Sequence, residues 1–161
     1  MHLAQMNVGT ILYETDDPRI ADFMNNLDRV NALAEATPGF VWRLTGDGNN
    51  ATDIRPADDP LFLVNMSVWE TVEALFEYVY RSDHRSFMVR RREWFAKPEG
   101  PYHVLWWVEE GHRPTVEEGL LRLRYLTDHG PTPYAFTFKS VFPPVSAPVD
   151  LKPEPYCVGW A

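Results

Sequence analysis

The sequence predicts an α+β domain built on one antiparallel sheet of four strands. Apolar and polar residues alternate in four short stretches, as in strands with two different faces. In the stretches between them, apolar residues recur every three or four positions, as in amphipathic helices. A strand, a helix and a strand follow one another twice along the chain. Two such halves favour helices packed on a sheet, and 161 residues suffice for one domain with a sizeable core.

The first half is predicted to contain a strand, a long helix, a second strand and a loop. The first strand is expected over residues 3–13. Asp16-Asp17-Pro18 is typical of a helix start, with an acidic cap and proline at the first helical position. Thr37-Pro38-Gly39 ends that helix. The second strand is expected over residues 40–45, and the loop over residues 46–60, which are rich in Gly, Asn, Asp and Pro. The inward face of the helix is expected to carry Ile20, Phe23, Leu27, Val30 and Ala34.

The second half repeats this order with a divided helix. A strand over 61–69, helices over 71–80 and 84–95, and a strand over 102–108 complete a ferredoxin-like β-α-β-β-α-α-β sandwich. The capping box Thr115-x-x-Glu118 begins an extra C-terminal helix, which Gly130-Pro131 ends. We expect the domain to span residues 1–142 and a Pro-rich extended tail, with the single cysteine Cys157, to span residues 143–161.

Alternation assigns the strand residues to two faces. A uniformly apolar face is expected to pack on the helices; it comprises Ala4, Met6, Val8, Phe40, Trp42, Leu44, Phe62, Val64, Met66, Val104, Trp106 and Val108. A mixed face is expected to be left open by the helices and to line a ligand cavity or a dimer core. It comprises Gln5, Asn7, Val41, Arg43, Leu61, Leu63, Asn65, Ser67, His103, Leu105 and Trp107.

Composition and motifs exclude several classes of function. The net charge of −8 argues against a general affinity for nucleic acid or for anionic membranes. The first residues lack the features of a signal peptide, and no apolar run approaches the ~18 residues of a membrane-spanning helix, so we expect a cytoplasmic protein. The histidines are scattered, and GxGxxG, P-loop and GxSxG motifs are missing. We therefore expect no metal site and no tightly held organic cofactor.

Several segments carry a family resemblance. They are HLAQMN, DRVNALAEATPGFVWRL, LVNMSVWETVEALFEYVYRSDHRSFMVRRREWF, YHVLWWVEEGHRPTVEEGLLRL and PTPYAFTF, and together they cover nearly all of residues 2–138. The chain resembles the DUF3291 proteins of the dimeric α/β-barrel superfamily, in which two ferredoxin-like protomers pack their sheets into one barrel. The run from YRSDH to REWF and the LWWV strand are the most specific segments.

This resemblance implies a class of function. The superfamily includes cofactor-free monooxygenases of polyketide tailoring, haem-dependent enzymes, and isomerases or cyclases. It therefore implies a homodimer that acts on a small, hydrophobic, oxygen-rich molecule, such as an aromatic polyketide, as a cofactor-independent monooxygenase. The alternatives are isomerisation or cyclisation in the same cavity, a haem-linked activity that depends on His84, and a non-catalytic dimeric ligand-binding protein.

Two histidines are the candidate catalytic residues. His84 follows the break between the two helices, and His103 opens the last strand on the mixed face. An ordinary imidazole pKa near ~6.5 suits proton transfer at neutral pH. The alternatives are a helix-capping role for His84 and a place at the rim or interface for His103.

The candidate substrate-binding residues are Asn7, Arg43, Asn65, Ser67, Arg91, Trp94 and Trp107. The asparagines and Trp107 suit an aromatic cavity with a few polar groups, and the alternative is packing in a dimer interface. Arg91 shares a helix face with Trp94 and could bind an anionic group; the alternative is that residues 90–92 form a solvated, ion-paired face. Arg43 lies on a strand and requires a carboxylate or a ligand as partner.

Overall fold

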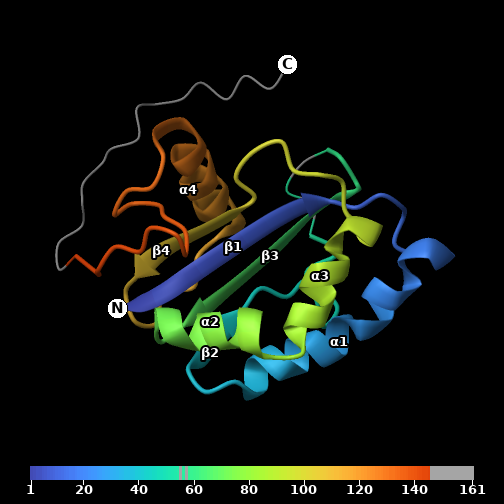
Figure 1. Ribbon diagram of the computed structural model, residues 1–161, viewed down its shortest axis with the longest axis horizontal. Helices are drawn as coiled ribbons and strands as arrows, with labels where there is room; N and C mark the ends of the chain where they lie inside the picture. Colours follow the sequence, from blue (N-terminus) through green and yellow to red (C-terminus); the bar gives the residue numbers. More distant parts are fainter. Residues whose placement is uncertain (55, 57, 146–161) are drawn as a thin grey trace.

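The computed structural model describes residues 1–54, 56 and 58–145, and it has the predicted ferredoxin-like sheet. The strands are β1 (His2–Thr10), β2 (Phe40–Arg43), β3 (Phe62–Trp69) and β4 (His103–Val108), in the order β2-β3-β1-β4 with every neighbouring pair antiparallel (Figure 1). The predicted α+β class is therefore confirmed, whereas the dimeric barrel stays a prediction. Most of the predicted tail, with Cys157, lies outside the described residues.

Two of the predicted caps, Asp17 and Thr115, lie at helix starts. A short 3-10 helix, η1 (Pro18–Ile20), leads into α1 (Ala21–Ala36), and α2 (Val72–Arg81), α3 (His84–Trp94) and α4 (Val116–His129) follow. The capping side chains are Asp17, Thr71 and Thr115, which accept hydrogen bonds from the backbone N–H groups of Arg19, Ala74 and Glu118. None of the helices in the described part of the chain is long and apolar enough to cross a membrane.

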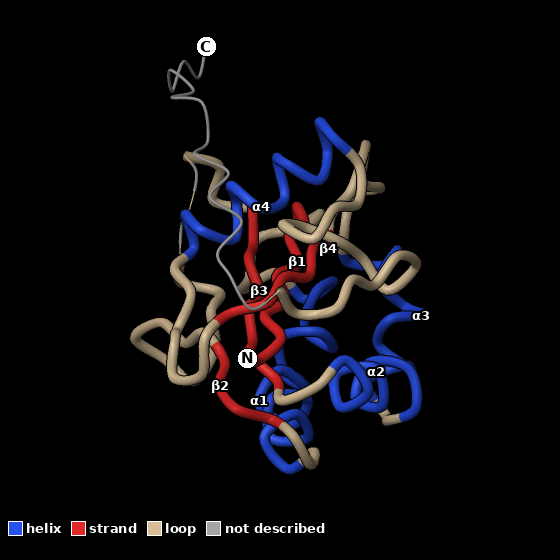
Figure 2. Tube along the Cα trace, turned by 90° about the vertical axis from the view of Figure 1, so that its left-hand side faces the viewer, coloured by secondary structure: helices blue, strands red, loops and turns tan. Residues whose placement is uncertain are grey.

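The prediction of which sheet face the helices cover is wrong. Helices α1, α2 and α3 lie on the mixed face, and α4 lies on the uniformly apolar face, on the other side of the sheet (Figure 2). Leu123 and Leu126 of α4 pack in one cluster with Met6 and Val104. The indole N–H of Trp106 donates a hydrogen bond of 2.9 Å to Glu118 at the start of α4. Helix α4 of the same chain therefore packs on the apolar face over β1, β3 and β4.

A β-bulge also changes one predicted face assignment. Phe40 pairs with Trp69 and Trp42 pairs with Val68, so the register shifts at Val41. Phe40 consequently packs with the helix-side cluster around Trp69, edge-to-face at 5.3 Å between ring centroids, and not beside Trp42. The predicted alternation of Phe40, Trp42 and Leu44 on one face is wrong at Phe40 for this reason.

The close approach of α4 to β1 predicts a destabilising substitution. A Cβ atom at Gly119 would lie 2.1 Å from Sδ and 3.4 Å from Cβ and Cγ of Met6, which is fully buried. We expect Gly119→Val to lower the free energy of unfolding by about 2 kcal/mol through overpacking, measured by urea denaturation. Leu121→Val, at an exposed position of the same helix, is the matched control, and equal effects of the two substitutions would contradict this packing argument.

Candidate functional site

A cavity of about 240 Å³ lies between the mixed face of the sheet and helices α1, α2 and α3. Its floor includes Gln5, Asn7, Gly9, Leu63, Asn65 and His103; its helical walls include Phe23, Leu27, Val30, Asn31, Leu75, Tyr78, Val79, His84, Phe87, Met88, Arg91 and Trp94. Helices of the same chain form these walls, and the predicted homodimer stays a prediction. The mixed composition of this face has a local cause: its polar residues border a space, while Leu63 and Leu105 pack in apolar clusters.

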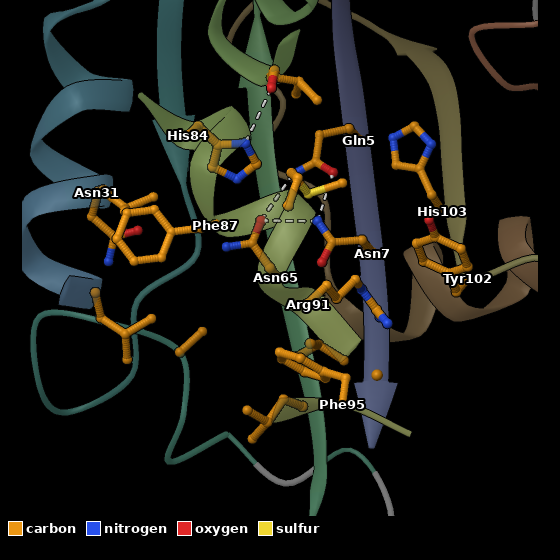
Figure 3. A pocket seen from close by; sticks show the side chains of 18 of the residues that line it. Gln5, Asn7, Asn31, Asn65, His84, Phe87, Arg91, Phe95, Tyr102 and His103 are labelled. Carbon is orange, nitrogen blue, oxygen red and sulfur yellow. Dashed lines mark hydrogen bonds between the residues drawn. The ribbon is translucent and has the colours of Figure 1, made fainter. Parts of the chain in front are cut away.

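A network of amides forms the floor of the cavity. Nε2 of Gln5 donates to Oδ1 of Asn65 at 3.0 Å and to Oγ of Ser67 at 2.9 Å, and Ser67 also accepts from the indole of Trp69 at 2.8 Å. Asn7 donates to Gln5 at 3.3 Å and to Oδ1 of Asn65 at 3.4 Å (Figure 3). Because Oδ1 of Asn65 is occupied as an acceptor, its Nδ2 group is left to donate to a molecule in the cavity. Asn65 is exposed in the middle of a central strand only because the cavity lies above it.

His84 lies in the wall of the cavity as a neutral imidazole, and one of its two ring nitrogens has a hydrogen-bond partner in the protein. Its Nδ1 lies 3.4 Å from the carbonyl oxygen of Val79, and its ring packs on Tyr78 at 4.7 Å between centroids. A carbonyl oxygen only accepts, so Nδ1 carries the proton and Nε2 carries the free lone pair. Burial lowers the pKa of His84, which keeps the ring unprotonated at neutral pH. Figure 3 shows the unbonded edge turned toward the cavity, on the side where Asn65 lies.

His103 reaches the cavity from β4 and has different surroundings. Its ring stacks on Phe138, with centroids 5.4 Å apart and planes 16° apart. Burial lowers its pKa to about 4, so it is also neutral at pH 7. No hydrogen-bond partner for its ring lies among residues 1–54, 56 and 58–145. Both candidate histidines therefore line one cavity, but only His84 has a bound edge that fixes its tautomer.

Arg91 carries the positive charge of the cavity. Its guanidinium group lies between the rings of Phe95 and Tyr102, 4.7 Å and 4.6 Å from their centroids, and Nη2 donates to the carbonyl of Val8 at 3.2 Å. Gly9 makes this position accessible, because a Cβ atom there would lie 2.8 Å from Nη2 of Arg91. Burial lowers the pKa of Arg91 from its ordinary value.

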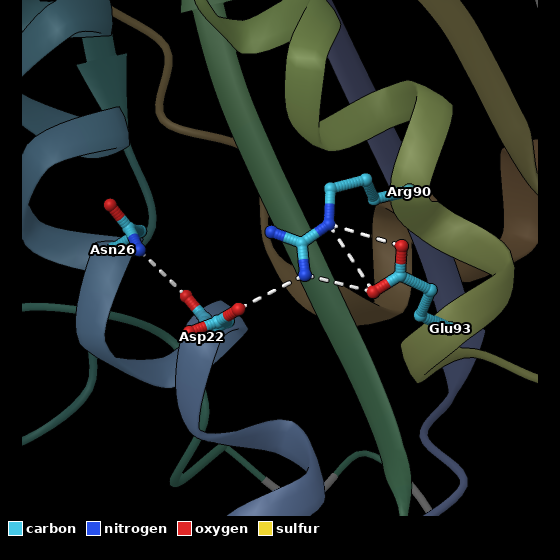
Figure 4. A network of polar contacts seen from close by, with 4 residues as sticks. All are labelled: Asp22, Asn26, Arg90 and Glu93. Carbon is cyan, nitrogen blue, oxygen red and sulfur yellow. Dashed lines mark hydrogen bonds and ion pairs between the residues drawn. The ribbon is translucent and has the colours of Figure 1, made fainter.

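The neighbouring arginines do not share this environment. Arg90 pairs with Asp22 at 3.0 Å and with Glu93 at 2.8 Å on the outside of α1 and α3 (Figure 4). Arg92 is exposed. The predicted solvated face is therefore an accurate description of Arg90 and Arg92, while Arg91 points into the cavity.

The structure brings six of the nine predicted site residues together in the cavity lining: Asn7, Asn65, His84, Arg91, Trp94 and His103. Three predicted substrate-binding residues lie outside that lining. Arg43 is held by Glu35 at 2.8 Å and by Asn49, as its need for a carboxylate partner required. Ser67 lies beneath Gln5, and the indole of Trp107 donates to the carbonyl of Phe142 at 2.7 Å. Each of the three therefore has a structural partner within the chain.

The sequence reasoning missed several lining residues. Asn31 is 9% exposed, and its side chain makes no hydrogen bond with another described residue, so its amide is available to the cavity. The sequence does indicate a special role for Asn31, because this polar residue interrupts the apolar face of α1 between Leu27 and Ala34. Gln5 was assigned to the mixed face but was not named as a binding candidate. Phe95 follows Arg91 by four residues, the spacing of neighbours on one helix face, and this local signal could have paired them. Tyr102 reaches Arg91 from the loop after α3, which no local pattern indicated.

The described residues do not fit a metal centre or a haem. No group of three or more His, Cys, Asp or Glu side chains gathers within residues 1–54, 56 and 58–145. His84 could offer Nε2 to a haem iron, but 240 Å³ is small beside the roughly 300–1,000 Å³ of ordinary ligand pockets. A single lining arginine would have to serve both haem propionates. We therefore derive no chemistry through a haem.

Comparison with known proteins identifies a family. The family described as "Domain of unknown function (DUF3291)" matches residues 2–151. None of the curated proteins matches the chain significantly.

Two solved structures are similar to this one at low identity. SnoaB, a cofactor-independent oxygenase from Streptomyces nogalater, is 20% identical, with 73% of this chain and 98% of that chain covered and a TM-score of 0.49. The NE2512 protein of unknown function from Nitrosomonas europaea is 13% identical, with 71% of this chain and 95% of that chain covered and a TM-score of 0.47. At these values the similarity carries no activity over to this chain.

Proposed function

The chain belongs to the DUF3291 family, whose description gives no activity, and we propose from the cavity that it is a proton-transferring enzyme of small molecules. Its substrate is hydrophobic and oxygen-rich, and its reaction is cofactor-independent monooxygenation. One observation carries the proposal: the free Nε2 of His84 and the free amide donors of Asn65 belong to one cavity between the sheet and helices α1, α2 and α3.

The first step is removal of a proton from the substrate. Neutral His84 takes a proton from an activated C–H or phenolic O–H group through Nε2, and Val79 holds the ring in position through Nδ1. The negative charge moves onto a substrate oxygen, and Nδ2 of Asn65 donates to that oxygen. The apolar side chains of the walls limit contact with water, which strengthens both interactions.

The second step uses oxygen as the only oxidant. The substrate anion gives its electron pair to O₂ and forms a C–O bond, and protonated His84 returns its proton to the peroxide. His84 then removes the second proton from the same carbon while the O–O bond breaks. A CH₂ group and O₂ thereby become a carbonyl and one water, so that atoms and electrons balance without a bound cofactor.

Isomerisation is the second candidate, because the same anion can accept the proton of His84 at a different carbon. The first step is shared, so only the fate of the anion separates the two reactions. A neutral base is the prerequisite of both, and burial supplies it by lowering the pKa of His84.

The deciding experiment gives the protein 1,8-dihydroxyanthrone, a tricyclic phenol with an acidic CH₂ group, under isotopically labelled oxygen. We expect oxygen uptake well above the protein-free rate and one labelled oxygen atom in the product. Proton exchange at the CH₂ group without oxygen uptake would favour isomerisation. If neither reaction exceeds the protein-free rate, for this compound and for smaller phenols, the proposed function is wrong.

A further inference from the structure

The charge distribution around the cavity is opposite to that of the protein. The whole chain has a net charge of −8, yet no Asp, Glu or Lys is among the described residues that line the cavity. Among the described lining residues, Arg91 is the one side chain with a permanent charge, since burial keeps both lining histidines neutral at pH 7. An anion in this cavity would therefore meet one cation and no acidic side chain in the lining.

The guanidinium group is prepared for a ligand and is not neutralised by the protein. Arg91 makes no ion pair with any residue of the described part of the chain, whereas Arg90, one position away, pairs with Asp22 and Glu93. Only one of its N–H groups has an acceptor there, the carbonyl of Val8. Figure 3 shows the group beside Asn7, between Phe95 and Tyr102. A partly buried, unpaired cation is costly, and a bound anion would offset that cost.

We propose that Arg91 is the anion-binding group of the cavity and that the natural substrate is an aromatic acid whose ionised carboxylate binds to it. This inference rests on the proposed function and names its substrate class. The planar guanidinium fork matches a carboxylate through two parallel N–H···O bonds. The rings of Phe95 and Tyr102 fix the plane of the fork, and the aromatic part of the substrate then extends toward Asn65 and His84.

A carboxylate suits this site better than a phosphate ester. A phosphate group carries up to two charges at neutral pH and is usually held by several cations or by a row of backbone N–H groups. The cavity offers one arginine and side-chain amides. One negative charge therefore matches the single positive charge of the lining.

The test compares two probes of the same shape by calorimetry at pH 7: 1-hydroxy-2-naphthoate and its neutral amide, 1-hydroxy-2-naphthamide. We expect the wild-type protein to bind the carboxylate at least tenfold more tightly than the amide. Arg91→Met keeps the apolar bulk between the two rings and is expected to remove this preference by weakening only the carboxylate. Arg91→Lys keeps the positive charge without the planar fork, so it should retain part of the preference for the carboxylate.

Arg92→Met is the matched control, since it removes an exposed charge from the next position of the same helix. It should leave both affinities unchanged, and circular dichroism should show every variant folded. Equal binding of the two probes by the wild-type protein, or equal losses in Arg91→Met and Arg92→Met, would overturn the anion site and leave the proposed function standing. Binding of neither probe would overturn both.

Discussion

Replacing His84 with glutamine is expected to slow the turnover of 1,8-dihydroxyanthrone by about 100- to 10,000-fold, the usual contribution of a general base. Glutamine keeps an amide N–H that can donate to the carbonyl of Val79, where Nδ1 of His84 lies at 3.4 Å. It has no group that can take a proton at neutral pH. The measurement is the rate of oxygen uptake at saturating and at low substrate concentration.

The loss should fall on kcat and leave KM within a few-fold, because the apolar walls and Asn65 still bind the substrate. His129→Gln is the matched control, since His129 is exposed and does not line the cavity. Full activity in His84→Gln would assign the base to another residue. Equal losses in both variants would point to a general effect of losing a histidine.

The order of the elements could be predicted from the sequence because local patterns determine it. The predicted caps Asp17 and Thr115 begin helices, and the two β-α-β halves led to the ferredoxin-like sheet. The choice of face could not be predicted in the same way. Each sheet face can pack on some helix, and the outcome depends on whether α4 or the α1–α3 layer takes the apolar side. That is a competition between distant segments, which alternation within a strand does not record.

In the candidate site, too, local sequence patterns revealed some features, while others depend on the tertiary structure. Asn65 and His103 could be found because strand alternation placed them on the mixed face. Arg91 could be found as a candidate, but residues 90–92 look alike in sequence and differ only in direction, because successive helix positions turn by about 100°. What distinguishes Arg91 is its place between Phe95 and Tyr102 and the space left by Gly9.

His103 is expected to make the protein less stable as the pH falls from 7 to 4.5. Its folded-state pKa is about 4, whereas in the unfolded chain it has the ordinary value of about 6.5. Below pH 6.5 the unfolded chain therefore binds a proton that the folded protein does not, and the free energy of unfolding decreases until the pH reaches about 4. The full difference corresponds to on the order of 3 kcal/mol at most, since the side chain is only partly shielded from water.

The measurement is urea denaturation of the wild-type protein and of His103→Gln at pH 7 and at pH 4.5. Carboxylates contribute to the pH dependence of both proteins, so the difference between their slopes isolates His103. The variant should lose some stability at pH 7, where the stacking on Phe138 is gone, and the gap should close as the pH falls. Parallel slopes would contradict a buried neutral imidazole. His84→Gln should also reduce the loss of unfolding free energy with falling pH, because burial lowers the pKa of His84 too. The two histidines that line the cavity thus make the fold sensitive to acid while remaining neutral at the pH at which the proposed base must act.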